Sequence, residues 1–141
     1  MDLLLVFLTM VKNFAETTEC PPVAALDSNN YVCSLCSCND FIINCQEKVI
    51  DNILPDYIWP NNETEYEVFM DNNVIRYVGE YPELPIVNLS LAHNLITEIV
   101  AGAFRNLTIL KELNLSDNYL MSGSLAPQIF RVGTRGSNIF I

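Results

Sequence analysis

The sequence predicts an α/β-type solenoid with short parallel strands, an irregular or short-helical convex side and a cysteine-rich N-terminal cap. Two observations carry this prediction. A frame of apolar residues recurs at intervals of 21 and 24 residues, which is typical of stacked coils. Four closely spaced cysteines come just before it. With 141 residues, 50% of them hydrophobic and 17% charged, the chain has enough apolar material for one core.

The apolar segment at the N-terminus predicts a signal peptide over about residues 1–15. Its run from Leu3 to Val11 is shorter than the roughly 20 residues that cross a bilayer, and Ala15 is a candidate for the residue before cleavage. A buried helix or strand is the alternative. Residues 16–32 are expected to form an N-terminal extension. The protein is expected to be secreted or extracellular, or to be the ectodomain of a longer membrane protein.

Four cysteines follow the pattern C-x2-C-x-C-x6-C: Cys33, Cys36, Cys38 and Cys45. In a secreted chain, such cysteines are first interpreted as disulfides. A thiol-disulfide redox protein that uses Cys33 and Cys36 is an alternative, although that chemistry needs a helix N-terminus to lower a thiol pKa. Zinc is not favoured because structural zinc ligands usually form two well-separated pairs. His93, the only histidine, is expected at the surface, and no metal or cofactor is expected.

The stretch LKELNLSDNYL at residues 110–120 has a spacing that neither a strand nor a helix explains. Moving 24 residues back gives IVNLSLAHNLI at residues 86–96 in the same frame, and a third copy surrounds Asn73. The shared pattern L-x-x-L-x-L-x-x-N-x-L is the leucine-rich repeat signature. Phe104 and Leu107 supply apolar residues for the return path. About three repeats are therefore predicted over residues 65–132.

Each element follows from this frame. The L-x-L core predicts a short strand whose two apolar side chains point into the solenoid. After the strand the chain turns, and an asparagine recurs at the turn: Asn73, Asn94 and Asn118. Its side chain is expected to form hydrogen bonds with backbone groups that the bend leaves unpaired. Stacked coils would then carry a structural asparagine ladder.

These repeats and the segment CSLCSCNDFIINC resemble the extracellular leucine-rich repeat family with a cysteine-rich N-terminal cap, over about residues 33–120. The passage DNILPDYIWPNNETEYEVFMDNNVI, which contains Leu54 and Pro55, is similar to the family's passage from cap to first repeat. The resemblance implies a cap over residues 33–64. Such a cap covers the apolar interior and the free strand edge of the first coil.

The resemblance also implies how the cap cysteines pair, with Cys33 bonded to Cys38 and Cys36 to Cys45. Cys20 has no partner in this pattern. We therefore expect it to be a free thiol, an intermolecular link or the partner of a cysteine absent from this chain.

The C-terminal residues depart from the repeat frame after Leu120. Gly123 falls where Ile99 stood, although Leu125, Pro127 and Phe130 could restore a return path. The final segment RVGTRGSNIFI contains no recognisable repeat and no C-terminal cysteine cap. Residues 133–141 are thus expected to be an irregular tail, and the chain a fragment or short form of a longer protein. The uncovered third coil is expected to promote self-association.

The strong negative charge of the chain makes negatively charged partners unfavourable. Seven Lys and Arg residues against seventeen Asp and Glu residues give a net charge of −10, which repels phosphate backbones and anionic membranes. Nucleic acid is therefore not an expected partner. Acidic residues concentrate between Asp51 and Glu83, where Arg76 is the only basic residue. A solvated acidic surface explains such a run more often than a basic partner does.

The binding surface has to be argued from residues that the strands expose, because a fold alone does not determine function. Positions three, five and seven of each repeat are expected to line a concave sheet face. Phe69 is the candidate apolar anchor, with a polar rim around it, or else it packs against the cap. The predicted binding surface comprises Tyr66, Glu67, Phe69, Asp71, Asn88, Ser90, Glu112 and Asn114.

Catalysis has little support in the sequence, which contains no glycine-rich phosphate loop, no serine nucleophile motif and no metal-binding pair of histidines. A non-enzyme is expected. The main prediction is an extracellular protein–protein or protein–glycan binding module that uses the concave strand face or the cap edge. A secreted redox protein and a truncated product without a binding role are the alternatives.

Four N-x-S/T sequons are potential glycosylation sites: Asn62, Asn88, Asn106 and Asn114. Glycans on Asn88 or Asn114 would cover the strand face. If that face binds the partner, occupancy is expected to be high at Asn62, plausible at Asn106 and low at the two strand sites.

Overall fold

The computed structural model describes residues 30–60, 64–125, 127–129 and 136–141. Residues Tyr31–Ile141 form one compact unit, and everything below concerns this unit. The predicted signal peptide, nearly all of the N-terminal extension, Cys20 and the Asn62 sequon lie outside the described residues. Among the helices of the described residues, none is long and apolar enough to cross a bilayer.

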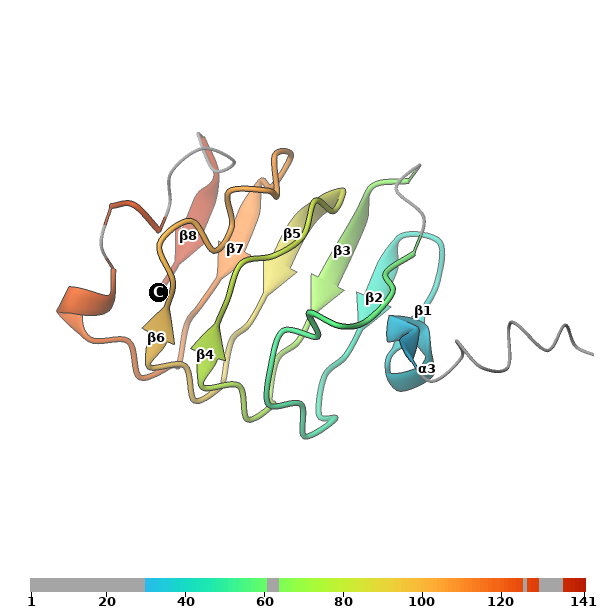
Figure 1. Cartoon of the computed structure of the whole chain (residues 1–141), viewed down its shortest axis with the longest axis horizontal. Coiled ribbons are helices and arrows are strands. Elements are labelled where there is room, and N and C mark those ends of the chain that lie inside the picture. Colours follow the sequence, from blue (N-terminus) through green and yellow to red (C-terminus); the bar gives the residue numbers. More distant parts are fainter. Residues whose placement is uncertain (1–29, 61–63, 126, 130–135) are drawn as a thin grey trace, which may run out of the picture. The chain divides into compact units, whose positions relative to one another are not determined.

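Within the described residues, six strands form one sheet, in the order β1-β2-β3-β5-β7-β8. All neighbouring pairs are parallel except β1 and β2, which are antiparallel. Figure 1 shows the parallel strands side by side, with the cap strands β1 and β2 at one end of the series. The strands are β1 (Ser37–Cys38), β2 (Ile42–Asn44), β3 (Tyr66–Phe69), β5 (Ile86–Ser90), β7 (Glu112–Asn114) and β8 (Asn138–Phe140).

The return path of each coil contains little regular structure. Strands β4 (Tyr77–Val78) and β6 (Glu98–Ile99) pair in parallel as a second, two-stranded sheet, visible in Figure 1. The described helices are α3 (Val32–Leu35) in the cap and the 3₁₀ turn η2 (Ser122–Ser124). The predicted solenoid is thus confirmed, and its return side is made of turns and short strands.

The core is formed by the apolar positions of the repeat frame. On strands β3, β5 and β7, the side chains of Val68, Leu89 and Leu113 are at most 1% exposed and lie in register with one another. The return path contributes Phe104 and Leu107, both buried as predicted. Burying an aliphatic side chain of this size stabilises a fold by about 1.5–3 kcal/mol. The stacked apolar columns therefore explain why coils without long helices remain packed.

The recurring asparagines connect consecutive coils. Asn94 is 2% exposed, and its Nδ2 donates to the carbonyls of Met70, Leu91 and Ala92 at 2.9–3.2 Å. Its Oδ1 accepts a hydrogen bond from the Ile75 N–H at 3.2 Å. Asn73 and Asn118 make corresponding bonds to the coil that precedes each of them. This asparagine ladder satisfies buried backbone groups that the turns would otherwise leave unpaired.

The C-terminal segment corrects one prediction. Residues 138–140 were expected in an irregular tail, but they form β8, in register with β7 through pairs such as Leu113 with Ile139. The Leu115 N–H also donates to the Phe140 carbonyl at 2.7 Å. The third coil is thus covered by β8, and the free edge of the sheet moves to β8 among the described residues. Self-association through this end stays a prediction. The spacing of 26 residues from Leu113 to Ile139 differs from the 24 of the preceding step and hides the match.

The return path after β7 also differs from the prediction. Of the residues expected to restore it, Leu125 is half-buried, Pro127 is exposed and Phe130 lies outside the described residues. Ile129, which is 3% exposed, supplies a buried apolar side chain that the frame did not predict. The Gln128 carbonyl accepts a hydrogen bond from the Gly102 N–H at 3.3 Å and so joins this segment to the preceding coil.

The backbone conformation of Val49, in the cap, indicates that a substitution there would stabilise the protein. It has φ of 58° and is 77% exposed. A β-branched residue is unfavourable in this left-handed conformation by about 1–2 kcal/mol, whereas asparagine tolerates it. Val49→Asn is therefore expected to raise the free energy of unfolding by about 1 kcal/mol in urea denaturation. The matched control is Val74→Asn at another exposed valine, which is not among the positive-φ residues; an equal gain there would contradict this explanation.

Candidate protein-binding face

The parallel sheet arranges the predicted surface residues in columns across the strands. The third-position column contains Glu67, Asn88 and Glu112, and β8 adds Asn138 to it. The fifth-position column contains Phe69, Ser90, Asn114 and Phe140. We call the face that carries these two columns the strand face. Neighbouring strands in a sheet lie about 4.8 Å apart, so the residues of one column are close enough to contact a single partner together.

A shallow hollow of about 240 Å³ lies on the strand face. Phe69 and Phe140 stand three strand spacings apart in the fifth-position column and line it together. Phe69 is half-buried, and Phe140 is 52% exposed. The remaining lining residues are Glu67, Asn88, Leu89, Ser90, Glu112 and Asn114.

Phe69 lies between the hollow and the cap. Its side chain lines the hollow, while its strand pairs with the cap through Asn44 of β2. The Phe69 carbonyl also accepts a hydrogen bond from the Cys45 N–H at 2.7 Å. The cap therefore holds the backbone that presents this aromatic side chain.

Some polar side chains of the hollow form hydrogen bonds within the protein, and others do not. The Asn88 Nδ2 donates to Glu67 Oε1 at 3.0 Å, which orients this carboxylate. Asn114 Oδ1 accepts hydrogen bonds from Ser116. Glu112 is exposed, and among the described residues its carboxylate forms neither a hydrogen bond nor an ion pair within the usual distances. The third- and fifth-position columns contain carboxylates but no lysine or arginine, so the strand face has a negative electrostatic character.

Tyr66 was predicted in the binding surface and lies in the interior instead, where it is 3% exposed. An irregularity in strand pairing between Tyr66 and Glu67 brings Tyr66 opposite Ile86, an inward-facing position. Burial raises the pKa of Tyr66 to about 12, so its hydroxyl remains protonated at physiological pH. The ring still lines a second pocket of about 350 Å³ in the cap, beside Cys33 and Cys38.

Asp71 and Ser90 mainly brace the sheet. The Asp71 carboxylate accepts hydrogen bonds from Gln46 Nε2 at 2.8 Å, from the Ala92 N–H at 2.9 Å and from the Ser90 hydroxyl. Ser90 is only 9% exposed. These contacts join three coils at the C-terminal ends of their strands. Of the predicted surface, Glu67, Phe69, Asn88, Glu112 and Asn114 therefore remain available for binding.

The frame missed Phe140 and Asn138. Both lie in the segment that was expected to be irregular, yet the alternation Ile139, Phe140, Ile141 matches the L-x-L core with one outward residue between two apolar ones. This alternation was the signal that could have identified Phe140 as the counterpart of Phe69.

The cap is held by two disulfides, Cys33–Cys38 and Cys36–Cys45, so the pairing that the resemblance implied is confirmed. Cys33 and Cys36 are each bonded to a different partner, which contradicts the redox alternative because a C-x-x-C redox centre joins its own two cysteines. Within the described ranges, His, Cys, Asp and Glu side chains form no group suited to a metal ion.

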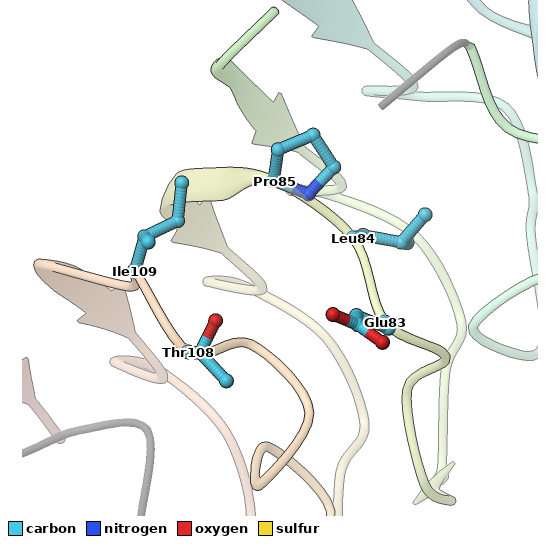
Figure 2. A pocket seen from close by; sticks show the side chains of 5 residues that line it. All are labelled: Glu83, Leu84, Pro85, Thr108 and Ile109. Atoms are coloured by element: carbon cyan, nitrogen blue, oxygen red, sulfur yellow. The ribbon is translucent and has the colours of Figure 1, made fainter. Parts of the chain in front are cut away.

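A third pocket, of about 140 Å³, lies where the chain enters β5 and β7. Figure 2 shows that Glu83, Leu84 and Pro85 from one coil and Thr108 and Ile109 from the next line it. It holds one carboxylate and one hydroxyl, and Asn106 of the nearby sequon uses its Nδ2 to bond the Tyr81 carbonyl at 2.8 Å. A glycan replaces only one of the two hydrogens on Nδ2, so this contact is compatible with glycosylation.

The parallel strands, the asparagine ladder and the disulfide-bonded N-terminal cap together form a solenoid of the leucine-rich repeat type. Residues 85–129 match the sequence model of the family described as leucine rich repeat.

Among similar proteins, podocan of Mus musculus is 30% identical over 83 residues, which cover 59% of this chain and 14% of podocan. Mimecan of Gallus gallus is 28% identical over 121 residues, or 84% of this chain and 40% of the relative. Mimecan of Coturnix japonica is 29% identical over 115 residues, which cover 80% of this chain and 38% of the relative. The chain thus spans less than half the length of these relatives.

Proposed function

We propose that the chain is an extracellular protein-binding module whose strand face contacts the partner. The hollow between Phe69 and Phe140 carries this proposal, because half-exposed aromatic side chains surrounded by polar groups are typical of interface centres. The two disulfides favour an oxidising, extracellular setting, and the similarity to podocan and mimecan favours a leucine-rich repeat protein of the same kind.

The proposal requires the strand face to be free of glycans. Asn88 and Asn114 both line the hollow, so we keep the expectation that their sequons are largely unoccupied. Asn106 lies on the return path, where a glycan would leave the hollow open.

The cap edge is the second candidate surface. Its pocket of about 350 Å³ is lined by Asp40, Pro60 and Tyr66, among others. The Tyr66 hydroxyl is buried without a hydrogen-bond partner among the described residues, and a partner that supplies an acceptor there would satisfy it.

A paired set of arginine substitutions tests the strand face. In the double variant Asn88→Arg and Asn114→Arg, two long side chains should fill the hollow and neutralise its carboxylates. Binding of the secreted chain to decellularised extracellular matrix is expected to fall at least tenfold, measured by quantitative immunodetection. The control is Thr97→Arg with Ala101→Arg, which adds the same charge at exposed positions of the return path.

The comparison between the two double variants decides the outcome. Loss of binding in the strand-face variant alone supports the proposal. Retained binding, or equal loss in both variants, excludes the strand face and directs attention to the cap edge. Circular dichroism and urea denaturation of both variants establish that each remains folded.

A further inference from the structure

We propose that the hollow on the strand face recognises an arginine side chain flanked by apolar residues in an extended segment of a protein partner. This inference rests on the proposed function of the strand face and specifies the chemistry of its partner. The observations behind it are the volume of the hollow, its two aromatic walls and its carboxylates, which form no ion pair with any described residue.

The volume favours a single side chain with its neighbours over a small-molecule ligand. Pockets for small molecules usually enclose about 300–1,000 Å³, whereas this hollow encloses about 240 Å³. Phe69 and Phe140 are separated by three strand spacings, or roughly 14 Å between backbones. That width accommodates one side chain between the two rings.

The electrostatics favour a cation in that space. Glu67 and Glu112 stand in one column with Asn88 between them, about 9–10 Å apart along the sheet. The Glu67 carboxylate is already oriented by Asn88, and neither column contains a cation. A positively charged partner would complement both carboxylates, which supplies orientation and specificity.

Arginine fits these groups better than lysine does. A planar guanidinium carries five N–H donors, pairs with carboxylates and stacks on aromatic faces. The exposed ring of Phe140 and the half-buried ring of Phe69 offer such faces. Apolar residues on either side of the arginine would contact the remaining ring surface. Sulfated glycans are disfavoured because they share the negative charge of the hollow.

The test uses the full secreted chain and defined probes. The blocked peptide Gly-Leu-Arg-Leu-Gly is titrated into isotope-labelled protein and followed by nuclear magnetic resonance. Its counterpart contains citrulline, which keeps the shape of arginine but lacks the charge. We expect the citrulline peptide to bind at least tenfold more weakly, and the arginine peptide to weaken as salt is raised because its charges are screened.

Matched protein variants locate the effect. Glu67→Gln with Glu112→Gln removes two charges from the hollow, and glutamine retains the oxygen that accepts from Asn88. The arginine peptide is expected to lose at least tenfold in affinity for this variant, while the citrulline peptide loses little. The control Glu83→Gln with Glu98→Gln removes the same charge from exposed positions outside the hollow and should leave both affinities unchanged.

Three results would overturn the inference. They are equal binding of the arginine and citrulline peptides, no detectable binding of either, and preferential binding of the neutral oligosaccharide maltohexaose at the same resonances. If matrix binding still depends on the strand face in those cases, the proposed function stands and only the partner chemistry is wrong. If matrix binding does not depend on that face, both proposals fail.

Discussion

Replacing Asn94 with alanine is expected to lower the free energy of unfolding by at least about 3 kcal/mol, because each buried backbone group left unsatisfied costs about 1–3 kcal/mol. The Asn94 side chain bonds the carbonyls of Met70 and Leu91 and the N–H of Ile75. At 2% exposure, water cannot replace those bonds. Urea denaturation, with the slope of the transition compared between variants, measures the loss.

Asn118→Ala is the matched control. Asn118 makes the same kind of bonds, to Leu91, Leu115 and Ile96, but it is half-exposed. Water can therefore satisfy part of what is lost, and the destabilisation should be clearly smaller. Equal losses in the two variants would mean that burial does not determine the energetic importance of the ladder.

Removing the Cys36–Cys45 disulfide is the second substitution with a large expected effect. The double variant Cys36→Ala with Cys45→Ala should lose about 2–4 kcal/mol of stability, the range typical for a native disulfide. Cys45 is fully buried and Cys36 is 6% exposed, so alanine also leaves unfilled space. The Cys45 carbonyl also accepts a hydrogen bond from the Asn73 Nδ2 at 2.8 Å. Greater mobility of Cys45 should therefore weaken the first hydrogen bonds of the asparagine ladder.

The control removes the other disulfide, in Cys33→Ala with Cys38→Ala. That bond closes a sequence separation of 5 rather than 9, and shorter loops constrain the unfolded chain less. Its cysteines are also less buried. Denaturation under non-reducing conditions should show the smaller loss for this pair; the reverse order would contradict the role assigned to Cys45.

The repeat frame could be predicted from sequence because one physical requirement repeats in each coil. Inward residues such as Leu89 and Leu113 must face the same interior, and each turn must satisfy its backbone groups, so the apolar positions and the asparagines recur together. The disulfide pairing came from the resemblance. The strand columns of the candidate site follow from the same frame, since parallel strands in register bring equal positions together.

What could not be predicted depends on contacts between coils or on local changes of register. Tyr66 moved inward because of the irregularity beside Glu67, which no apolar pattern records. Asp71 became a structural residue because Gln46 and Ser90 approach it from the coils on either side. Phe140 was missed because two extra residues in the return path displaced it from the expected interval.

The asparagine ladder also gives the chain a direction. Each asparagine side chain donates a hydrogen bond to a backbone carbonyl of the preceding coil. The acceptors are Cys45 for Asn73, Met70 for Asn94 and Leu91 for Asn118. Each coil therefore satisfies backbone groups of the preceding coil, and these groups are already present when the asparagine of the new coil is added. A ribosome delivers the coils in this same order, and domains fold as they emerge during synthesis. We therefore expect vectorial assembly, in which the cap provides hydrogen-bonding groups for the first coil and every coil provides them for the next.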